Sequence, residues 1–239
     1  MAPDKLDPNA VALFLDVDGT LLEIMNNPAD VSADTRLVNL LEACFESLGG
    51  AMALVSGRSV DEVDRIFAPA VFPVAGSHGA ELRIDGGKIV TVAHDPLPEE
   101  ALAPLAELAA AHDGLLLEHK RGGVSLHYRR APELESGCRE LVTRIMAELG
   151  DSFRLIAGKM VFEIAPGAYD KGAARHTFLE TSPFAGRVPV CLGDDVTDED
   201  GFRVVNELAG LSIRIGDIER SAARYRLDDV AAVRPWLDR

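Results

Sequence analysis

Three short, uninterrupted apolar runs alternate with two helix-like segments at the start of the chain, and this alternation constrains the fold most strongly. The runs are 11–15, 51–55 and 72–75, and apolar residues recur at helical spacing over about 34–48 and 59–68. Uninterrupted apolar runs are typical of strands buried on both faces of a sheet. Strands that alternate with helices form parallel sheets with right-handed crossovers. The first third therefore predicts an α/β fold with a parallel sheet.

The middle third departs from this alternation. Residues 80–84 and 88–92 flank the turn signal Asp85-Gly86-Gly87, which predicts a hairpin. The elements expected after it are helices over 98–111 and 133–149 and strands near 115–120, 123–129, 153–156 and 160–164. This order indicates an antiparallel α+β segment.

The last third returns to the parallel pattern. A helix is predicted from 171 to about 180, then a strand at 188–192, a helix at 198–208 and a strand at 211–215. We therefore expect a discontinuous core of residues 1–82 and 165–239, with residues 83–164 inserted as an α+β cap domain.

The composition excludes several classes of protein. The net charge is −15 and no basic run exceeds two residues, which argues against a nucleic-acid binder. No run approaches the ~20 apolar residues of a membrane helix, and residues 1–10 do not resemble a signal peptide. Three widely spaced cysteines suit a reducing compartment. We expect a cytoplasmic protein with no nucleic-acid or membrane partner, most simply a monomer.

The run Asp16-Val17-Asp18-Gly19-Thr20 follows the first predicted strand directly. The carboxyl ends of parallel strands are where open α/β sheets bind ligands, so Asp16 stands at a favourable place for chemistry. Gly19 is expected to bend the backbone and present its amide to an anion. An alternative is that the run is only a polar strand end with a turn, because Asp-Gly pairs are common in turns.

A second polar group, Ser56-Gly57-Arg58, follows the second predicted strand. The Ser56 hydroxyl is placed to donate to a phosphoryl oxygen. The alternative is that this serine caps the next helix, and both roles are compatible because a helix N-terminus is itself an anion site.

An acidic cluster, Gly193 to Asp200, follows another strongly apolar strand. It is either a solvated helix-capping loop or a set of hard oxygen ligands for Mg²⁺, which usually binds one or two carboxylates. Suitable ligands are the Asp16 side chain, the Asp18 backbone carbonyl and the Asp194 side chain. Lys171 precedes another helix, which would allow its ammonium to lie beside Asp16, although a lysine taken singly is more often a surface residue.

Taken in order, these groups resemble the four motifs of the haloacid dehalogenase (HAD) superfamily. The resemblance implies a Rossmann-like core with a cap inserted between the second and third motifs. More closely, the chain resembles the trehalose-6-phosphate phosphatases, most specifically in Gly193-Asp194-Asp195-Val196-Thr197-Asp198-Glu199. One departure is Ala165, where that family often has a basic residue, so one polar contact to the substrate is in doubt.

The resemblance implies an Mg²⁺-dependent hydrolysis of trehalose 6-phosphate, the last step of trehalose biosynthesis, through an aspartyl-phosphate. Asp16 would be the nucleophile, Asp18 the acid and then the base, and Ser56 and Lys171 would stabilise the phosphoryl group. The metal residues expected are Asp16, Asp18, Asp194, Asp195 and Asp198. The substrate-binding residues expected are Gly19, Thr20, Gly57, Arg58, His78, Glu118, Lys120, Arg129, Lys159 and Glu163.

Three functional hypotheses remain open from the sequence. The first is the trehalose-6-phosphate phosphatase, and the second keeps the chemistry but acts on sucrose 6-phosphate or a hexose phosphate. The third is a non-catalytic sugar-phosphate sensor or subunit, and association with a synthase is left undecided. The cap residues alone would also fit a set of cross-strand salt bridges on a sheet face.

Overall fold

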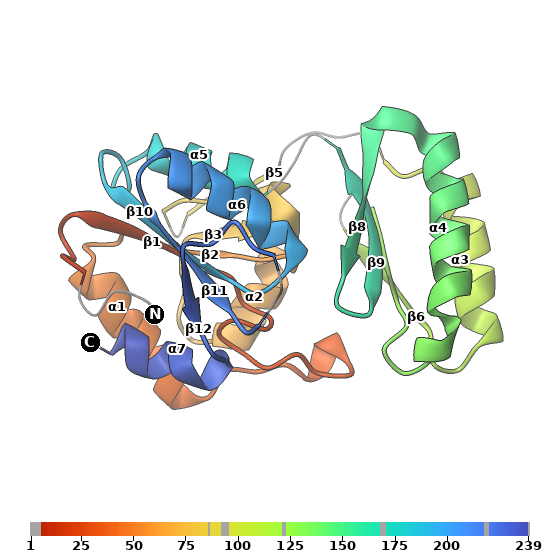
Figure 1. Ribbon diagram of the computed structural model, residues 1–239, viewed down its shortest axis with the longest axis horizontal. Helices are drawn as coiled ribbons and strands as arrows, with labels where there is room; N and C mark the ends of the chain where they lie inside the picture. The colour runs from red at the N-terminus through yellow and green to blue at the C-terminus, as the bar shows by residue number, and fades with distance from the viewer. Residues whose placement is uncertain are drawn as a thin grey trace. The chain divides into compact units, whose positions relative to one another are not determined.

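The structure is a computed structural model that describes residues 6–85, 87–91, 96–120, 123–167, 171–217 and 220–238. It contains two compact units (Figure 1). The first combines residues 1–92 with 170–239, and the second comprises 93–169. These divisions differ from the expected ones at 82/83 and 164/165, because the predicted hairpin belongs to the first unit and a strand of the second runs beyond 164.

The first unit is built on an eight-stranded sheet in the order β12-β11-β10-β1-β2-β3-β4-β5. The strands are β1 (Val11–Leu15), β2 (Met52–Val55), β3 (Val74–Gly76), β4 (Glu81–Arg83), β5 (Val90–Thr91), β10 (Val188–Gly193), β11 (Leu211–Ile215) and β12 (Tyr225–Leu227). All neighbours from β12 to β3 pair in parallel, whereas β4 and β5 are antiparallel. The predicted parallel α/β core is confirmed.

Helices cover both faces of this sheet (Figure 1). They are α1 (Thr35–Ser47), α2 (Val60–Phe67), α5 (Lys171–Leu179), α6 (Val196–Glu207) and α7 (Val230–Leu237). Leu13 and Leu15 of β1 share a hydrophobic cluster with α1, α2 and α7, while Ala12 and Phe14 pack with Phe178 of α5. Since side chains alternate along a strand, β1 is apolar on both sides and lies buried in the middle of the unit.

Two details of the last third differ from the sequence prediction. Helix α6 begins at Val196, two residues before the predicted start at 198, and Asp198 therefore lies inside its first turn. Its carboxylate instead accepts the amides of Asp194 and Asp195 at the N-terminus. Strand β12 and helix α7 were not predicted, since the strand has only three residues and the helix contains Pro235.

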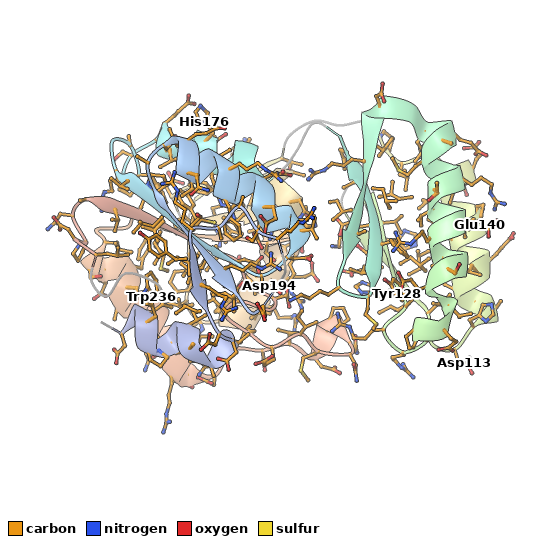
Figure 2. All side chains as sticks on the ribbon, in the orientation of Figure 1. Asp113, Tyr128, Glu140, His176, Asp194 and Trp236 are labelled. Carbon is orange, nitrogen blue, oxygen red and sulfur yellow. The ribbon has the colours of Figure 1, made fainter. Side chains whose placement is uncertain are left out.

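The second unit is a four-stranded antiparallel sheet in the order β6-β7-β9-β8, with two helices on one face (Figure 1). Its elements are α3 (Glu99–Ala111), β6 (Leu116–Lys120), β7 (Gly123–His127), α4 (Glu135–Leu149), β8 (Phe153–Gly158) and β9 (Val161–Pro166). Leu105, Val142 and Phe162 belong to the shared core, as does Tyr128, which stacks on Phe162 (Figure 2). The other face of the sheet carries polar side chains.

Among the described residues, no helix has both the length and the apolar character that a membrane crossing requires.

Candidate active site

Asp16 and Lys171 form a short, buried ion pair at the carboxyl end of β1. The Lys171 Nζ donates to the Asp16 Oδ1 over 2.6 Å, and the two residues are 3% and 4% exposed. Asp16 follows the last residue of β1, and its amide donates to the Leu192 carbonyl of β10. Lys171 is the first residue of α5. The carboxylate is therefore held at one end by the sheet and at the other by an ammonium, as the sequence predicted.

Asp198 connects this ion pair to the start of α6. Its Oδ1 accepts from Lys171 over 3.0 Å and from the Arg175 Nη2 over 3.3 Å. Its Oδ2 accepts the amides of Asp194 and Asp195 over 3.1 and 3.3 Å. Both carboxylate oxygens of Asp198 are thus engaged by the protein, so this residue organises the site.

Burial and charge act in opposite directions on these groups. Burial raises the pKa of Asp16 well above its ordinary value, and Lys171 only partly opposes this. Burial would lower the pKa of Lys171, but the charges of Asp16 and Asp198 outweigh it and raise that pKa. Burial likewise raises the pKa of Asp198, and Lys171 and Arg175 reverse this to a net lowering. The lysine is therefore charged, and the charge of the Asp16 carboxylate is less fully compensated than that of Asp198.

Three buried carboxylates come close enough to share a cation. Oxygens of Asp16, Asp194 and Asp198 lie within 4.8 Å of one another. Asp194 lies in the first unit (Figure 2). A Cβ on Gly19, whose φ is +84°, would collide with the Asp194 carboxylate, so the backbone after Asp18 passes directly beside this group. Hard oxygen donors of this kind suit Mg²⁺, and Asp198 is the member already committed to two cations. The residues present fit the metal, which Asp16 and Asp194 would hold.

Two further acidic residues expected at the metal do not join this cluster. Asp18 directs its side chain to Arg58, whose Nε and Nη2 donate to the two carboxylate oxygens over 2.6 and 2.7 Å. Asp195 is partly exposed and is the N-cap residue of α6. The role of the Asp18 backbone carbonyl as a metal ligand stays a prediction.

Arg58 was expected to bind substrate, but its guanidinium is engaged inside the protein. Besides the fork to Asp18, its Nη1 donates to the Pro28 carbonyl over 2.9 Å. That carbonyl belongs to the short 3-10 helix η1 (Pro28–Asp30). Because both Asp18 oxygens accept from Arg58, proton transfer by Asp18 requires at least one of these bonds to be exchanged.

Ser56 and its neighbours form a compact turn after β2. The Ser56 Oγ accepts the Arg58 amide over 3.1 Å, which leaves the hydroxyl proton for another acceptor. It does not cap α2, because the N-cap is Ser59, which forms a capping box with Glu62. The helix-cap alternative is therefore wrong for Ser56. A Cβ on Gly57 would lie 2.6 Å from the His78 Nε2, so this position needs a glycine.

The turn that contains His78 is hydrogen-bonded to the loop that contains Ser56. The backbone bends through the short 3-10 helix η2 (Ser77–Gly79), where both Ser77 and His78 have positive φ angles, +48° and +55°. The amides of these two residues donate to the carbonyls of Arg58 and Ser56. Such backbone is costly and is found where the surroundings over-determine it. The turn therefore fixes the Ser56 loop, whereas a direct sugar contact by His78 stays a prediction.

Two expectations about the first motif were too simple. The Gly19 amide does not face an open site, because it donates to the Leu22 carbonyl over 2.7 Å. Thr20 is fully buried, and its hydroxyl has no hydrogen-bond partner in the described part of the chain. The tight turn after Asp18 therefore engages the Gly19 amide, which the sequence analysis assigned to the ligand.

The predicted cap residues gather on the polar face of the second sheet. Glu118, Ser125 and Glu163 are in register on β6, β7 and β9. Glu163 accepts from Lys120 over 2.7 Å and from Ser125 over 2.9 Å, and Glu118 pairs with His127 over 2.7 Å. We call Glu118, Lys120, Ser125, His127 and Glu163 the cap polar cluster. Burial tends to raise the pKa of Glu118, but His127 and Lys120 lower it overall.

Arg129 and Lys159 are the other two residues of the second unit that the sequence analysis expected to bind substrate. The Arg129 Nη2 donates to the Lys159 carbonyl over 2.6 Å. The structure therefore joins these two residues to each other through the backbone.

Sequence reasoning missed Arg175, Ser125 and His127. Arg175 stands four residues after Lys171, which places both on one helix face, so the spacing carried a usable signal. Ser125 and His127 alternate along β7 on the face that carries Glu118. Period-two reasoning on that strand would have found them.

Comparison with solved structures defines the class of fold. The C-terminal domain of C. albicans trehalose-6-phosphate phosphatase matches with a TM-score of 0.84 at 21% identity, over 99% of this chain and 97% of that one. A phosphatase of the HAD superfamily from Bacteroides thetaiotaomicron matches with a TM-score of 0.63 at 17% identity, over 99% and 96%. The chain has the HAD fold.

Sequence relatives narrow the class to a family. The trehalose-phosphatase family model matches residues 14–231. A probable trehalose-phosphate phosphatase of Sinorhizobium fredii is 44% identical over 86% of this chain and 77% of its own length. The trehalose-6-phosphate phosphatase of Escherichia coli is 40% identical over 95% and 85%. The chain belongs to the trehalose-phosphatase family.

Proposed function

We propose that this protein hydrolyses trehalose 6-phosphate to trehalose and inorganic phosphate with Mg²⁺ as cofactor. The observation that carries the proposal is the family match, which spans both units of the chain and includes the buried Asp16–Lys171 pair. The two relatives named above are described as a probable trehalose-phosphate phosphatase and a trehalose-6-phosphate phosphatase. The cytoplasmic location and the monomeric state stay predictions from the sequence.

Asp16 is the nucleophile in this proposal. Its carboxylate oxygen attacks phosphorus in line, the Asp16 O–P bond forms, and the bond from phosphorus to the sugar oxygen breaks. Lys171 keeps Asp16 oriented and, with the Ser56 hydroxyl, balances charge on the phosphoryl oxygens. The metal, when bound, supplies further electrostatic stabilisation of these oxygens.

Asp18 is the general acid of the first step and the general base of the second. Once one of its hydrogen bonds from Arg58 is broken, Asp18 in its protonated form gives a proton to the departing sugar oxygen, because an alkoxide is a poor leaving group. It then takes a proton from the water that attacks the aspartyl-phosphate. The Asp16 O–P bond breaks in that second step, which restores Asp16 and yields inorganic phosphate.

Phosphate release from trehalose 6-phosphate tests the proposal directly. With Mg²⁺, the parent protein is expected to turn over this ester faster than sucrose 6-phosphate or glucose 6-phosphate. Asp16→Asn is expected to abolish release, whereas Asp200→Asn, which alters an exposed pair with Arg203 in the same acidic stretch, should retain it. A preference for another ester favours the second hypothesis of the sequence analysis. Saturable binding without turnover favours the sensor.

A further inference from the structure

Arg175 is a fully buried cation that the proposed chemistry does not use. It lies on α5 one turn after Lys171, with 0% exposure. Its Nη2 donates to the Asp198 Oδ1, the same oxygen that accepts from Lys171. Arg175 is therefore one contact removed from the lysine that holds the nucleophile.

The surroundings of Arg175 include two features that lower the stability of the folded protein. Gly201 lies inside α6, where a glycine weakens a helix, and any Cβ there would collide with the Arg175 Nη1. The Nε and Nη1 of Arg175 are buried without a hydrogen-bond partner in the described residues. Buried donors left unsatisfied are also destabilising. Neither feature improves stability, which points to a role in the site.

The charge balance of the site indicates what that role is. Three buried carboxylates, Asp16, Asp194 and Asp198, face two buried cations, Lys171 and Arg175. A divalent metal added to this set leaves a net charge of +1, which suits a phosphoryl dianion. Without Arg175 the same set would be neutral with the metal and doubly negative without it.

We propose that Arg175 is a positioning residue that acts through Asp198, fixing Lys171 and setting the balance between metal binding and phosphate binding. The proposal rests on the phosphatase function given above. The Asp198 Oδ1 is shared by both cations, and its Oδ2 holds the amides that begin α6. Arg175 thus supports the lysine and the Asp194 backbone together, and its charge weakens the attraction of the carboxylates for the metal.

The distinctive prediction is a pair of changes with opposite signs. In Arg175→Met, Mg²⁺ should bind more tightly, on the order of tenfold, because one nearby positive charge is gone. Inorganic phosphate should bind more weakly to the Mg²⁺-loaded protein, and kcat should fall roughly 10- to 100-fold, as for other groups that orient the residues around a metal. Arg175→Lys keeps the charge, so its Mg²⁺ affinity should equal that of the parent.

Calorimetric titrations with Mg²⁺ alone, and with inorganic phosphate at saturating Mg²⁺, provide the test. Arg83→Met is the matched control, because Arg83 is also buried and pairs with an aspartate, Asp64, away from the site. It should lower the melting temperature but leave both affinities and kcat unchanged. If Arg175→Met does not fold, Gly201→Ala, which forces a methyl group against the guanidinium, replaces it and should lower kcat and weaken phosphate binding.

Two outcomes overturn the proposal. One is Arg175→Met with parental affinities and kcat. The other is a loss of Mg²⁺ and phosphate binding together, which is the result of a generally disordered site. Neither titration uses a sugar phosphate, so a mistaken substrate would show as absent turnover in the parent protein while the binding measurements still decide the role of Arg175.

Discussion

The polar residues of the two units are held in place by different means. In the first unit they stand at strand ends and helix starts, and Asp16, Lys171 and Asp198 are fixed by short ion pairs and by backbone amides. In the second unit they project from the middle of strands, and Glu118, Glu163 and their partners hold one another across the sheet. The first arrangement depends on where the chain turns, whereas the second depends on which strands are neighbours. We therefore expect changes in the first unit to affect chemistry, and changes in the second to affect the choice of substrate.

The largest contrast is expected between two lysines given the same substitution. Lys171→Met removes the cation beside the nucleophile and should lower kcat about 10²- to 10³-fold, the usual effect of losing one stabilising donor. Lys120→Met removes a partner of Glu163 and should mainly raise KM for trehalose 6-phosphate. Steady-state kinetics on both variants measures the two parameters. Equal losses of kcat in the two variants would contradict the expectation that the first unit governs chemistry and the second unit the choice of substrate.

Mg²⁺ should stabilise the protein through the first unit alone. At a concentration 100 times its Kd, a cation that binds only the folded state adds about 2.7 kcal/mol to the free energy of unfolding. Thermal melts with added Mg²⁺ and with a chelator measure this shift. Asp194→Asn should abolish it, and Glu118→Gln in the cap polar cluster should preserve it. Chelation should also stop phosphate release, and a melting temperature indifferent to Mg²⁺ would argue against the metal site.

Two serines provide a smaller contrast. Ser125→Ala removes a hydrogen bond to Glu163 and is expected to lower kcat/KM for trehalose 6-phosphate about tenfold, since a bond to a charged group contributes about 1.5 kcal/mol or more. The same variant should hydrolyse p-nitrophenyl phosphate, which has no sugar, at the parental rate. Ser56→Ala should impair both substrates. A loss on both substrates in Ser125→Ala would mean that the cap polar cluster is needed for more than selectivity.

The smallest expected effect is on stability, at Asp34, which belongs neither to the Asp16 site nor to the cap polar cluster. Asp34 caps α1 through the Leu37 amide and accepts from Arg234 of α7. Asp34→Ala should lower the free energy of unfolding by about 1 kcal/mol, as for other N-caps. Asp34→Asn keeps a cap acceptor and should cost less. Neither variant should change kcat.

The sign of the pH dependence at Asp34 follows from its pKa. The hydrogen bond from Arg234, followed by that from the Leu37 amide, lowers the pKa of Asp34 below its ordinary value. The charged form is therefore favoured by folding, and its contribution is complete above the unfolded pKa of about 3.9 and disappears as the pH falls through the lower folded value. The free energies of unfolding of the parent protein and Asp34→Asn, measured with denaturant, should differ at pH 7, and the difference should shrink as the pH falls below the unfolded pKa of about 3.9.

The difference between residues at strand ends and residues placed by loop contacts or strand pairing explains what the sequence could predict. Asp16, Ser56 and Asp194 follow apolar runs that read clearly as strands, and parallel strands bring their carboxyl ends to one edge. The parallel core was therefore predictable, whereas the pair of Asp16 with Lys171 followed only from the order of the four motifs taken together. The fork between Arg58 and Asp18, the use of the Gly19 amide and the role of Ser77 in the turn were not, because they depend on φ angles and loop contacts that no periodicity encodes. Period-two reasoning could have placed Ser125 and His127 on one face of β7, but their partners follow only from the pairing of β7 with β6 and β9.

The order of strands in the first sheet has a consequence for how the protein is made. β1 pairs with β2, which follows soon after it, and also with β10, which is synthesised only after the whole second unit. The second unit, by contrast, is one continuous stretch of chain whose strands pair within 93–169. Pairings between distant segments form slowly, and contiguous units fold early during synthesis. The cap is thus expected to reach its fold while β1 still exposes one edge, so the nascent first unit is the stage most exposed to aggregation.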